Sequence, residues 1–225
     1  MNYAISEDLF NGVNPFQGVV GEGIGTDEEK RQPLSEEHMH ACWTNLDTLA
    51  PADQLLWRLL AKTGMRLGEA MSIRKEGQER GTKIRFVTVG TKTDASLRRV
   101  PLPVDLGLPA EIKGQLFEGT ASAASKRLNR FIKDSLADWE RGLVVHSLRH
   151  RAIDVFRLTS HADPYLRRRL VGHAATDVHD SYGASGPPMH LLLPMIEANP
   201  IDGSLVFQAR RRSDQPLAEP ALPAA

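Results

Sequence analysis

Apolar residues follow two different periodicities along the chain, and each predicts one type of element. A helical spacing runs through most of the sequence, as over 52–63, where four leucines share one face and Gly64 follows as a C-cap. A period of two runs over 83–89 and returns over 97–101, which predicts the two strands of a hairpin. The pattern therefore predicts a mostly α domain with a small antiparallel β-sheet, an α+β fold.

Capping residues mark the starts of several predicted helices. Ser35 is a favourable N-cap, and Asp163-Pro164 combines an N-cap Asp with Pro at the first helical position. Caps and spacing together predict helices over 35–47, 52–63, 66–74, 122–139, 147–159, 163–171, 177–182 and 188–197. The last of these is rich in leucine, so it either packs on its own domain or docks on another copy of the chain.

Composition divides the chain into three segments. Residues 1–34 contain several glycines without sustained periodicity, which is typical of a linker or an extended arm. This arm is acidic. The segment 201–225 is rich in Arg, Ala and Pro, and we expect it to be a disordered tail. The folded domain is predicted between them, at 35–200.

The charge of the chain is unevenly distributed. The 28 basic and 28 acidic residues cancel, which taken alone would argue against a nucleic-acid partner. However, residues 1–37 hold eight acidic and two basic side chains, whereas 141–173 holds seven arginines and two aspartates. A basic surface is therefore expected on the domain, and the acidic arm hides it in the total.

Cysteine content and hydropathy indicate where the protein works. The single Cys42 cannot form an intramolecular disulfide, which fits a reducing compartment. No apolar run reaches the ~18 residues that a membrane span needs, and the first ten residues are acidic where a signal peptide is basic. We expect a cytoplasmic protein without a membrane partner.

The first segment with candidate chemistry is Thr63-Gly64-Met65-Arg66-Leu67-Gly68-Glu69-Ala70. A Gly C-cap followed directly by a new helix puts Arg66 at a helix–helix junction, where its guanidinium can face a cleft. Taken alone, the motif also fits a surface arginine in a helical hairpin. Glu69, three residues on, either orients neighbouring groups or is an exposed helix carboxylate.

The second segment is His146-Ser147-Leu148-Arg149-His150. On a helix His146 and Arg149 share a face, so an imidazole and a guanidinium can converge on one anion. His146 and His150 also have the i, i+4 spacing of zinc ligands, but the Glu of a His-Glu-x-x-His protease is missing and no nearby carboxylate completes a site. We predict no metal. Ser147 lacks the strand-to-helix turn of a nucleophilic serine.

The third segment is Leu170-Val171-Gly172-His173, followed by Tyr182. Nine residues separate His173 from Tyr182, which leaves room for a turn and a short helix that return the phenol to the same cleft. A lone tyrosine is otherwise more often a packing residue.

Together these segments resemble the catalytic domain of the tyrosine recombinase, or phage integrase, family over about 35–190. The matching residues are Arg66 in TGMRLGEA, Lys92 in GTKTDASLRRVPLP, His146 and Arg149 in HSLRHR, His173 in VGH, and Tyr182. Asn14-Pro15-Phe16 is similar to the linker that precedes such domains. Three features depart from the family: a charged stretch at 76–81, His179 where many members have Thr, and an arm too short for the usual DNA-clamping domain.

The resemblance implies an enzyme that breaks and rejoins DNA by transesterification, with no metal, ATP or other cofactor. Tyr182 would attack the scissile phosphate and form a 3′-phosphotyrosine. Arg66, Arg149 and His173 would bind that phosphate. His146 would accept the tyrosine proton or bond a phosphate oxygen, Lys92 would protonate the leaving 5′-oxygen, and Glu69 would orient the groups around Arg66.

The resemblance also implies partners. These are double-stranded DNA at a specific recombination site and further copies of the chain, as a tetramer on DNA and a monomer when free. Further arginines are expected to contact DNA phosphates: Arg98, Arg99, Arg151, Arg167 and Arg168. Arg98 and Arg99 alternate on a strand, so only one of them can share the face of Lys92.

Three other functions stay open on the sequence alone. The first is a DNA-binding protein of the same fold that does not cleave. The second is a type IB topoisomerase, which shares the chemistry, and the third and weakest is a metallohydrolase.

Overall fold

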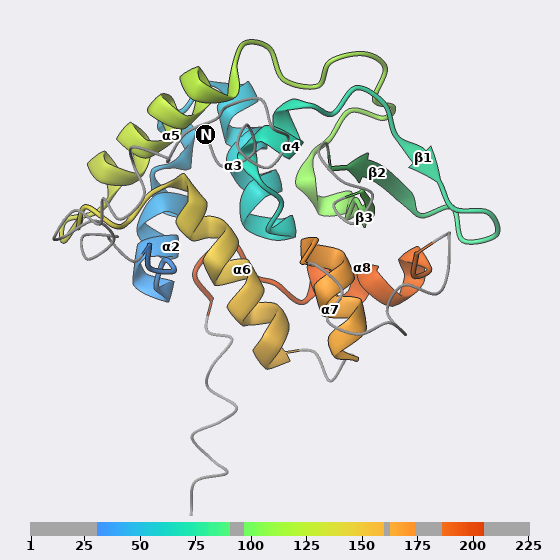
Figure 1. Cartoon of the computed structure of the whole chain (residues 1–225). Helices are drawn as coiled ribbons and strands as arrows, with labels where there is room; N and C mark the ends of the chain where they lie inside the picture. The colour runs from blue at the N-terminus through green and yellow to red at the C-terminus, as the bar shows by residue number, and fades with distance from the viewer. Residues whose placement is uncertain (1–30, 91–96, 160–162, 174–185, 205–225) are drawn as a thin grey trace, which may run out of the picture. The chain divides into compact units, whose positions relative to one another are not determined.

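The computed structural model describes residues 31–90, 97–159, 163–173 and 186–204. Within these ranges helices dominate, and the strands of one small sheet come between the third and fourth of these helices in the chain (Figure 1). The helices are α2 (Glu36–Thr44), α3 (Pro51–Thr63), α4 (Leu67–Met71), α5 (Ala121–Ser135), α6 (Val145–Thr159), α7 (Pro164–Val171) and α8 (Met189–Glu197). The strands are β1 (Gly77–Gln78), β2 (Arg85–Val89) and β3 (Arg98–Pro101), and short 3-10 turns occur at Leu46–Thr48 and Val104–Leu106.

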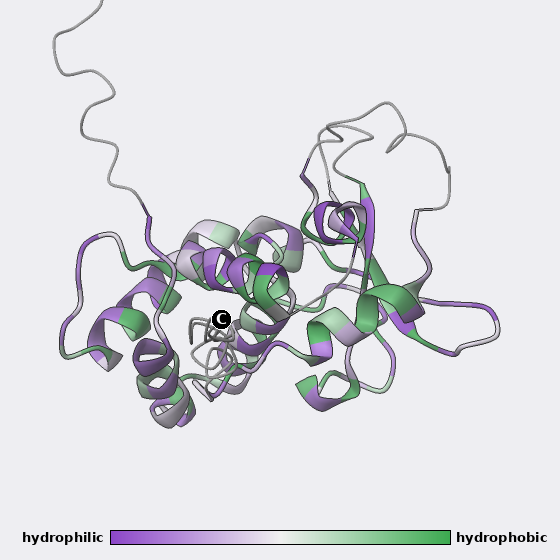
Figure 2. Ribbon diagram, turned by 90° about the horizontal axis from the view of Figure 1, so that it is seen from below, coloured by the Kyte–Doolittle hydropathy of each residue, from purple (hydrophilic) through white to green (hydrophobic). Residues whose placement is uncertain are grey.

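Helix α3 is central to the helical part of the core. The side chain of its residue Trp57 is fully buried and packs edge-on against the ring of Phe131 on α5, with the two ring centroids 6.5 Å apart. Helix α6 packs along α3, and α5 contacts both (Figure 1). Around most helices hydrophobic and hydrophilic residues alternate, as Figure 2 shows, which is the pattern of helices that bury one face.

The sheet has the order β1-β2-β3 with antiparallel pairing throughout. Val87 of β2 lies opposite Val100 of β3, and Val89 lies opposite Arg98. All four are buried, so one charged side chain shares the inward face of the sheet with three valines. Helices α7 and α8 pack against β3, which brings the end of the domain onto this sheet (Figure 1).

The predicted α+β class is confirmed, and so is the hairpin of β2 and β3. Every predicted helix that falls within the described ranges is found, with Ser35 and Asp163 as N-caps and Gly64 as a C-cap. The predicted helix 177–182 lies outside the described residues.

Several predicted helix ends were wrong. Helix α2 stops at Thr44, before a 3-10 turn, and α4 stops at Met71 rather than Arg74. Beyond α4, the Ile73 carbonyl accepts a hydrogen bond from Leu116 N instead of continuing the helix. Helix α5 ends at Ser135, because Leu136 has an extended backbone. Strand β1 was not predicted, since two residues carry no periodicity.

The leucine-rich helix α8 packs within the chain. Met189, Leu192, Met195 and Ile196 are buried in the common core, while Leu191 is exposed. Packing in cis is therefore the alternative that the structure supports. None of the helices in the described ranges has both the length and the apolar character needed to cross a membrane.

Candidate active site

The junction between α3 and α4 presents Arg66. Gly64 ends α3 with a left-handed backbone (φ 65°), and a Cβ there would lie 2.9 Å from Cβ of Ala152, so the turn is packed directly against α6. Arg66 then starts α4, where its backbone N–H donates to Glu69 Oε2 at 2.7 Å. Its side chain is 44% exposed, so a guanidinium stands at the surface of a tightly packed turn.

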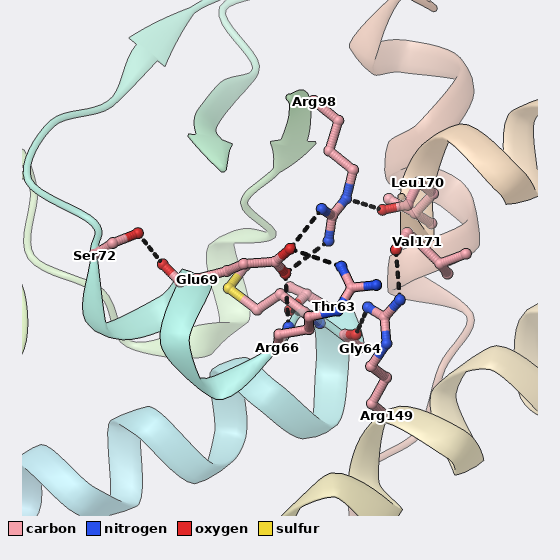
Figure 3. A network of polar contacts seen from close by, with 10 residues as sticks. Thr63, Gly64, Arg66, Glu69, Ser72, Arg98, Arg149, Leu170 and Val171 are labelled. Atoms are coloured by element: carbon pink, nitrogen blue, oxygen red, sulfur yellow. Dashed lines mark hydrogen bonds and ion pairs between the residues drawn. The ribbon is translucent and has the colours of Figure 1, made fainter. Parts of the chain in front are cut away.

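Glu69 is a buried carboxylate held between two arginines, as Figure 3 shows. Arg66 Nη1 donates to Oε1 at 2.9 Å, and Arg98 donates from Nη1 to Oε1 and from Nη2 to Oε2, both at 2.9 Å. The fork of Arg98 thus pairs with the carboxylate in the bidentate geometry that suits guanidinium. Glu69 thereby fixes the direction of the Arg66 side chain.

The two arginines keep Glu69 ionised. Burial alone would raise its pKa, but the hydrogen bonds and charge of Arg98, with those from Arg66, lower the pKa of Glu69 to about 2. The carboxylate therefore carries a full negative charge at neutral pH, and it is shared by two cations.

Arg149 approaches the same junction from α6. The start of α6 is fixed by Asn129 of α5, whose Oδ1 accepts from Val145 N at 2.7 Å, and by Ser147, whose Oγ accepts from Val144 N at 3.1 Å. Ser147 thus shapes the start of the helix. Arg149, 4% exposed, donates to the carbonyls of Gly64 at 2.7 Å and Val171 at 2.6 Å.

Positive charge exceeds negative charge in this cluster, since Arg66, Arg98 and Arg149 face one carboxylate, Glu69 (Figure 3). Burial and the neighbouring charges of Arg66 and Arg98 lower the pKa of Arg149 to about 10. Arg149 still remains protonated at neutral pH. Such a concentration of charge with perturbed pKa values is typical of a site that binds an anion.

Two candidate histidines accompany the arginines. His146 lies one turn before Arg149 in contact range of His150, with the ring centroids 4.9 Å apart. Burial, then the charges of His150, Arg31 and Arg149, lower the pKa of His146 to about 4. It is therefore neutral at pH 7 and can accept a proton or a hydrogen bond.

His173 follows the left-handed Gly172 (φ 70°) that ends α7, and it is exposed. Partial burial of its ring and then the charges of Arg149 and Arg66 lower the pKa of His173. The structure thus brings Arg66, Glu69, His146, Arg149 and His173 to one region, from α4, α6 and the end of α7. Lys92 and Tyr182 lie outside the described residues. Within the described ranges no three His, Cys, Asp or Glu side chains form a possible metal site.

Two of the five predicted DNA-contacting arginines are buried. Arg98 and Arg151 are 5% and 4% exposed. Arg98 pairs with Glu69, and Arg151 donates to Asn199 Oδ1 at 3.2 Å and to the Pro200 carbonyl at 3.0 Å. Since both guanidinium groups are buried inside the domain, the prediction that these two arginines stand at its surface for DNA was wrong.

The other three arginines keep partly exposed positions. Arg99 lies over the ring of Phe86, with Cζ 5.3 Å from its centroid. Arg167 and Arg168 line a groove of about 400 Å³ between α6 and α7, together with Arg157 and His173. Arg157 was not singled out from the sequence, because only the fold brings it alongside His173.

No family model matches the sequence, and no curated protein matches it. Among solved structures, a λ integrase tetramer bound to a Holliday junction aligns with a TM-score of 0.56 at 16% identity, covering 81% of this chain and 56% of that one. The integrase of mycobacterium phage Brujita aligns with a TM-score of 0.53 at 19% identity, covering 76% and 58%.

The integrase of transposon Tn1549, bound to transposon right-end DNA, aligns with a TM-score of 0.51 at 13% identity, covering 85% of this chain and 73% of the integrase. The chain thus spans just over half the length of the λ and Brujita proteins. These likenesses show that the chain has the fold of a tyrosine recombinase catalytic domain.

Proposed function

We propose that this chain carries the catalytic domain of a site-specific tyrosine recombinase, which cleaves and rejoins DNA through a 3′-phosphotyrosyl intermediate. One observation carries the proposal: Arg66 and Arg149 come from separate helices and meet at one packed junction, with Gly64 O bonded to Arg149 and Glu69 bonded to Arg66. This arrangement suits the recognition of one phosphate by two guanidinium groups, as the family resemblance requires.

The arginines would stabilise the transition state. Attack on a phosphodiester adds negative charge to the non-bridging oxygens, and preorganised cations stabilise that charge best. Arg66 and Arg149 are held by hydrogen bonds before substrate arrives, so little reorganisation is needed. Because they supply the positive charge, the proposed mechanism includes no metal ion.

The remaining roles rest on the resemblance. Tyr182 would be the nucleophile, since a phenol is more acidic than an alcohol, with a reference pKa of ~10. His146, neutral at pH 7, would take the phenolic proton or bond a phosphate oxygen, and His173 would bond the same phosphate. Lys92 would give a proton to the 5′-oxygen as it leaves.

The proposed substrate is double-stranded DNA at a specific recombination site. Partly exposed cations lie beside the candidate site: Arg157, Arg167 and Arg168 line the groove that also contains His173. Arg99 adds a further cation on the other face of β3, over Phe86. Contacts of this kind to the DNA backbone give affinity that falls with salt. The likeness to integrases solved on a Holliday junction and on transposon-end DNA supports the same partner. We further propose a monomer in solution and a tetramer on DNA.

Covalent trapping tests the proposal directly. The chain has three tyrosines, Tyr3, Tyr165 and Tyr182, so each can be changed to Phe in turn. The full chain is incubated with a pool of nicked suicide duplexes of randomised sequence, and the adduct is isolated under denaturing conditions and mapped by mass spectrometry. We expect an adduct at Tyr182, loss of it in Tyr182→Phe, and its retention in Tyr3→Phe and Tyr165→Phe.

Other outcomes distinguish the alternatives. DNA binding without any adduct would indicate a non-cleaving protein of this fold. An adduct at Tyr182 with relaxation of supercoiled plasmid, but without strand exchange between duplexes, would indicate a topoisomerase. An adduct at a different residue would remove Tyr182 from the proposed role.

A further inference from the structure

Hydrogen bonds and two short backbone segments, 64–66 and 170–171, together form a closed ring around the candidate site. From Arg66 the bonds run to Glu69, from Glu69 to Arg98, and from Arg98 Nε to the Leu170 carbonyl at 2.8 Å. The next residue, Val171, accepts from Arg149, whose other amino group donates to Gly64 at the start of the same turn (Figure 3). The ring therefore joins four elements: the α3–α4 junction, β3, the end of α7, and α6.

Arg98 closes this ring at the end of α7. The last carbonyls of a helix have no partner within it and attract cations. In α7 two of these carbonyls, those of Leu170 and Val171, accept from Arg98 and Arg149. His173 comes two residues after Val171. By holding the end of α7, the Arg98 side chain therefore also fixes the position of the His173 backbone.

Arg98 lies on the inward, buried face of β3. Its side chain is 3% exposed and lies on the face that otherwise carries Val87, Val89 and Val100. An unpaired charge there would be strongly unfavourable, and Glu69 balances it with both oxygens. Arg98 is thus too buried to reach a DNA backbone, while it contacts the partner of Arg66 directly.

We infer that Arg98 is a positioning residue of the site, which sets Arg66 through Glu69 and sets His173 through the Leu170 carbonyl. The inference rests on the proposed function. It assigns no contact between Arg98 and the reacting phosphate. Only a guanidinium fits this role, since it bonds two carboxylate oxygens with one edge and offers Nε to a carbonyl at the same time.

The substitution Arg98→Lys tests the inference, because it keeps the charge and removes the fork. The chain offers a matched control in Arg85 of β2. It pairs with both oxygens of Glu76 and donates to the Pro109 carbonyl, so it has the same kinds of partner, a carboxylate and a carbonyl, outside the ring. Both variants lose a carboxylate clamp on the sheet, and Arg85→Lys therefore reports the cost of that loss alone.

Single-turnover cleavage is measured at a temperature where circular dichroism shows each variant to be folded. We expect Arg98→Lys to lose at least ~10-fold in cleavage rate, as small misplacements of bound groups do, with less than a threefold change in DNA affinity. Arg85→Lys should stay within twofold of the wild-type rate. In an Arg66→Ala background, Arg98→Lys should cause a smaller further loss, because part of its effect acts through Arg66.

Three results of the cleavage assays would overturn the inference. The first is a folded Arg98→Lys that cleaves at the wild-type rate, and the second is an equal loss in both lysine variants. The third is full rescue of Arg98→Lys by a 5′-bridging phosphorothiolate, because that substrate restores only a missing proton donor.

A readout without cleavage separates this inference from the proposed function. The imidazole signals of His173 in ¹H–¹³C spectra of the free protein should shift in Arg98→Lys and not in Arg85→Lys. If the wild-type chain forms no adduct, the proposed function fails, and these spectra still decide whether Arg98 positions His173. An unchanged His173 signal in Arg98→Lys would contradict the positioning role.

Discussion

A Cβ atom on Gly172 would lie 2.6 Å from Nη1 of Arg98. The turn that ends α7 is therefore packed against the guanidinium that clamps Glu69. Gly172 has a φ of 70°, so the absence of a side chain serves two purposes: it permits the left-handed backbone and it leaves space for Arg98. The glycine of the Val-Gly-His segment thus explains how β3 can approach His173.

The substitution Gly172→Ala should damage both stability and cleavage. A left-handed Ala costs about 1–2 kcal/mol in backbone strain, and Arg98 must also move. Gly114→Ala is the matched control, because Gly114 has a φ of 83° and a Cβ there meets nothing within 4 Å. Urea unfolding should show a larger loss for Gly172→Ala, and cleavage should fall in that variant only. Equal effects of the two changes would contradict the close packing of Gly172 on Arg98.

Arg66→Ala and Arg149→Ala should both lose cleavage activity, but they should differ in the free energy of unfolding. Each should reduce cleavage by ~100-fold, the usual cost of one transition-state donor. Arg66 is partly exposed, so its removal should change the free energy of unfolding by less than about 1 kcal/mol. Removal of Arg149 leaves two buried carbonyls without their donor, which costs about 1–3 kcal/mol for each.

Urea unfolding and single-turnover cleavage measured on the same samples check this pair. A large stability loss in Arg66→Ala would mean that its ion pair with Glu69 holds the fold together. A wild-type cleavage rate in either variant would remove that arginine from the proposed mechanism.

The sequence predicts the elements of this fold well because their signals are local. Caps at Ser35, Gly64 and Asp163 depend on one or two residues, and the structure has all three. The prediction of helix ends fails where the deciding contact is distant in sequence. An example is Ile73, whose carbonyl accepts a hydrogen bond from Leu116 N. The two-residue strand β1 exists through its pairing with β2, which no local pattern contains.

The role of Arg98 likewise could not be predicted from the local sequence, because it depends on a distant residue. The alternation of a strand requires Arg98 and Arg99 to face opposite ways, but it does not say which one is buried. The answer depends on Glu69, which is 29 residues earlier in the chain and supplies the balancing charge. Counting arginines therefore predicted DNA contacts that burial rules out at Arg98 and Arg151.

The stability of the free protein should fall as the pH drops from about 6.5 to about 4, because of His146. Its pKa is lowered in the folded state, by burial first and then by His150 and Arg31. The unfolded chain therefore binds more protons than the folded one across this window, and unfolding is favoured. In the variant His146→Gln, the urea concentration at the unfolding midpoint should depend less on pH over this range. An NMR titration of His146 with a midpoint near 6.5 would contradict the prediction.

A second loss of stability should occur at lower pH, through Glu69. Burial opposes ionisation, but Arg98 and Arg66 lower the pKa of Glu69 to about 2, from an ordinary 4.5. The stabilisation is present above about pH 4.5 and is lost as the pH falls toward 2. Glu69→Gln should be less stable than wild type at pH 7, and the difference should shrink between pH 4.5 and 2. A constant difference across that range would show that the carboxylate charge contributes nothing.

Lys92→Ala should cleave ordinary DNA poorly and should be rescued by a 5′-bridging phosphorothiolate at the scissile bond. The reason is that a thiolate leaves without a proton, so a missing general acid no longer limits the rate. Arg149→Ala is the comparison variant, because its proposed role is charge stabilisation, and sulfur should not rescue it. The measurement is the ratio of single-turnover rates on sulfur and oxygen substrates. An equal defect of Lys92→Ala on both substrates would exclude it as the proton donor, and rescue of both variants would show that leaving-group departure, rather than charge stabilisation, is limiting throughout.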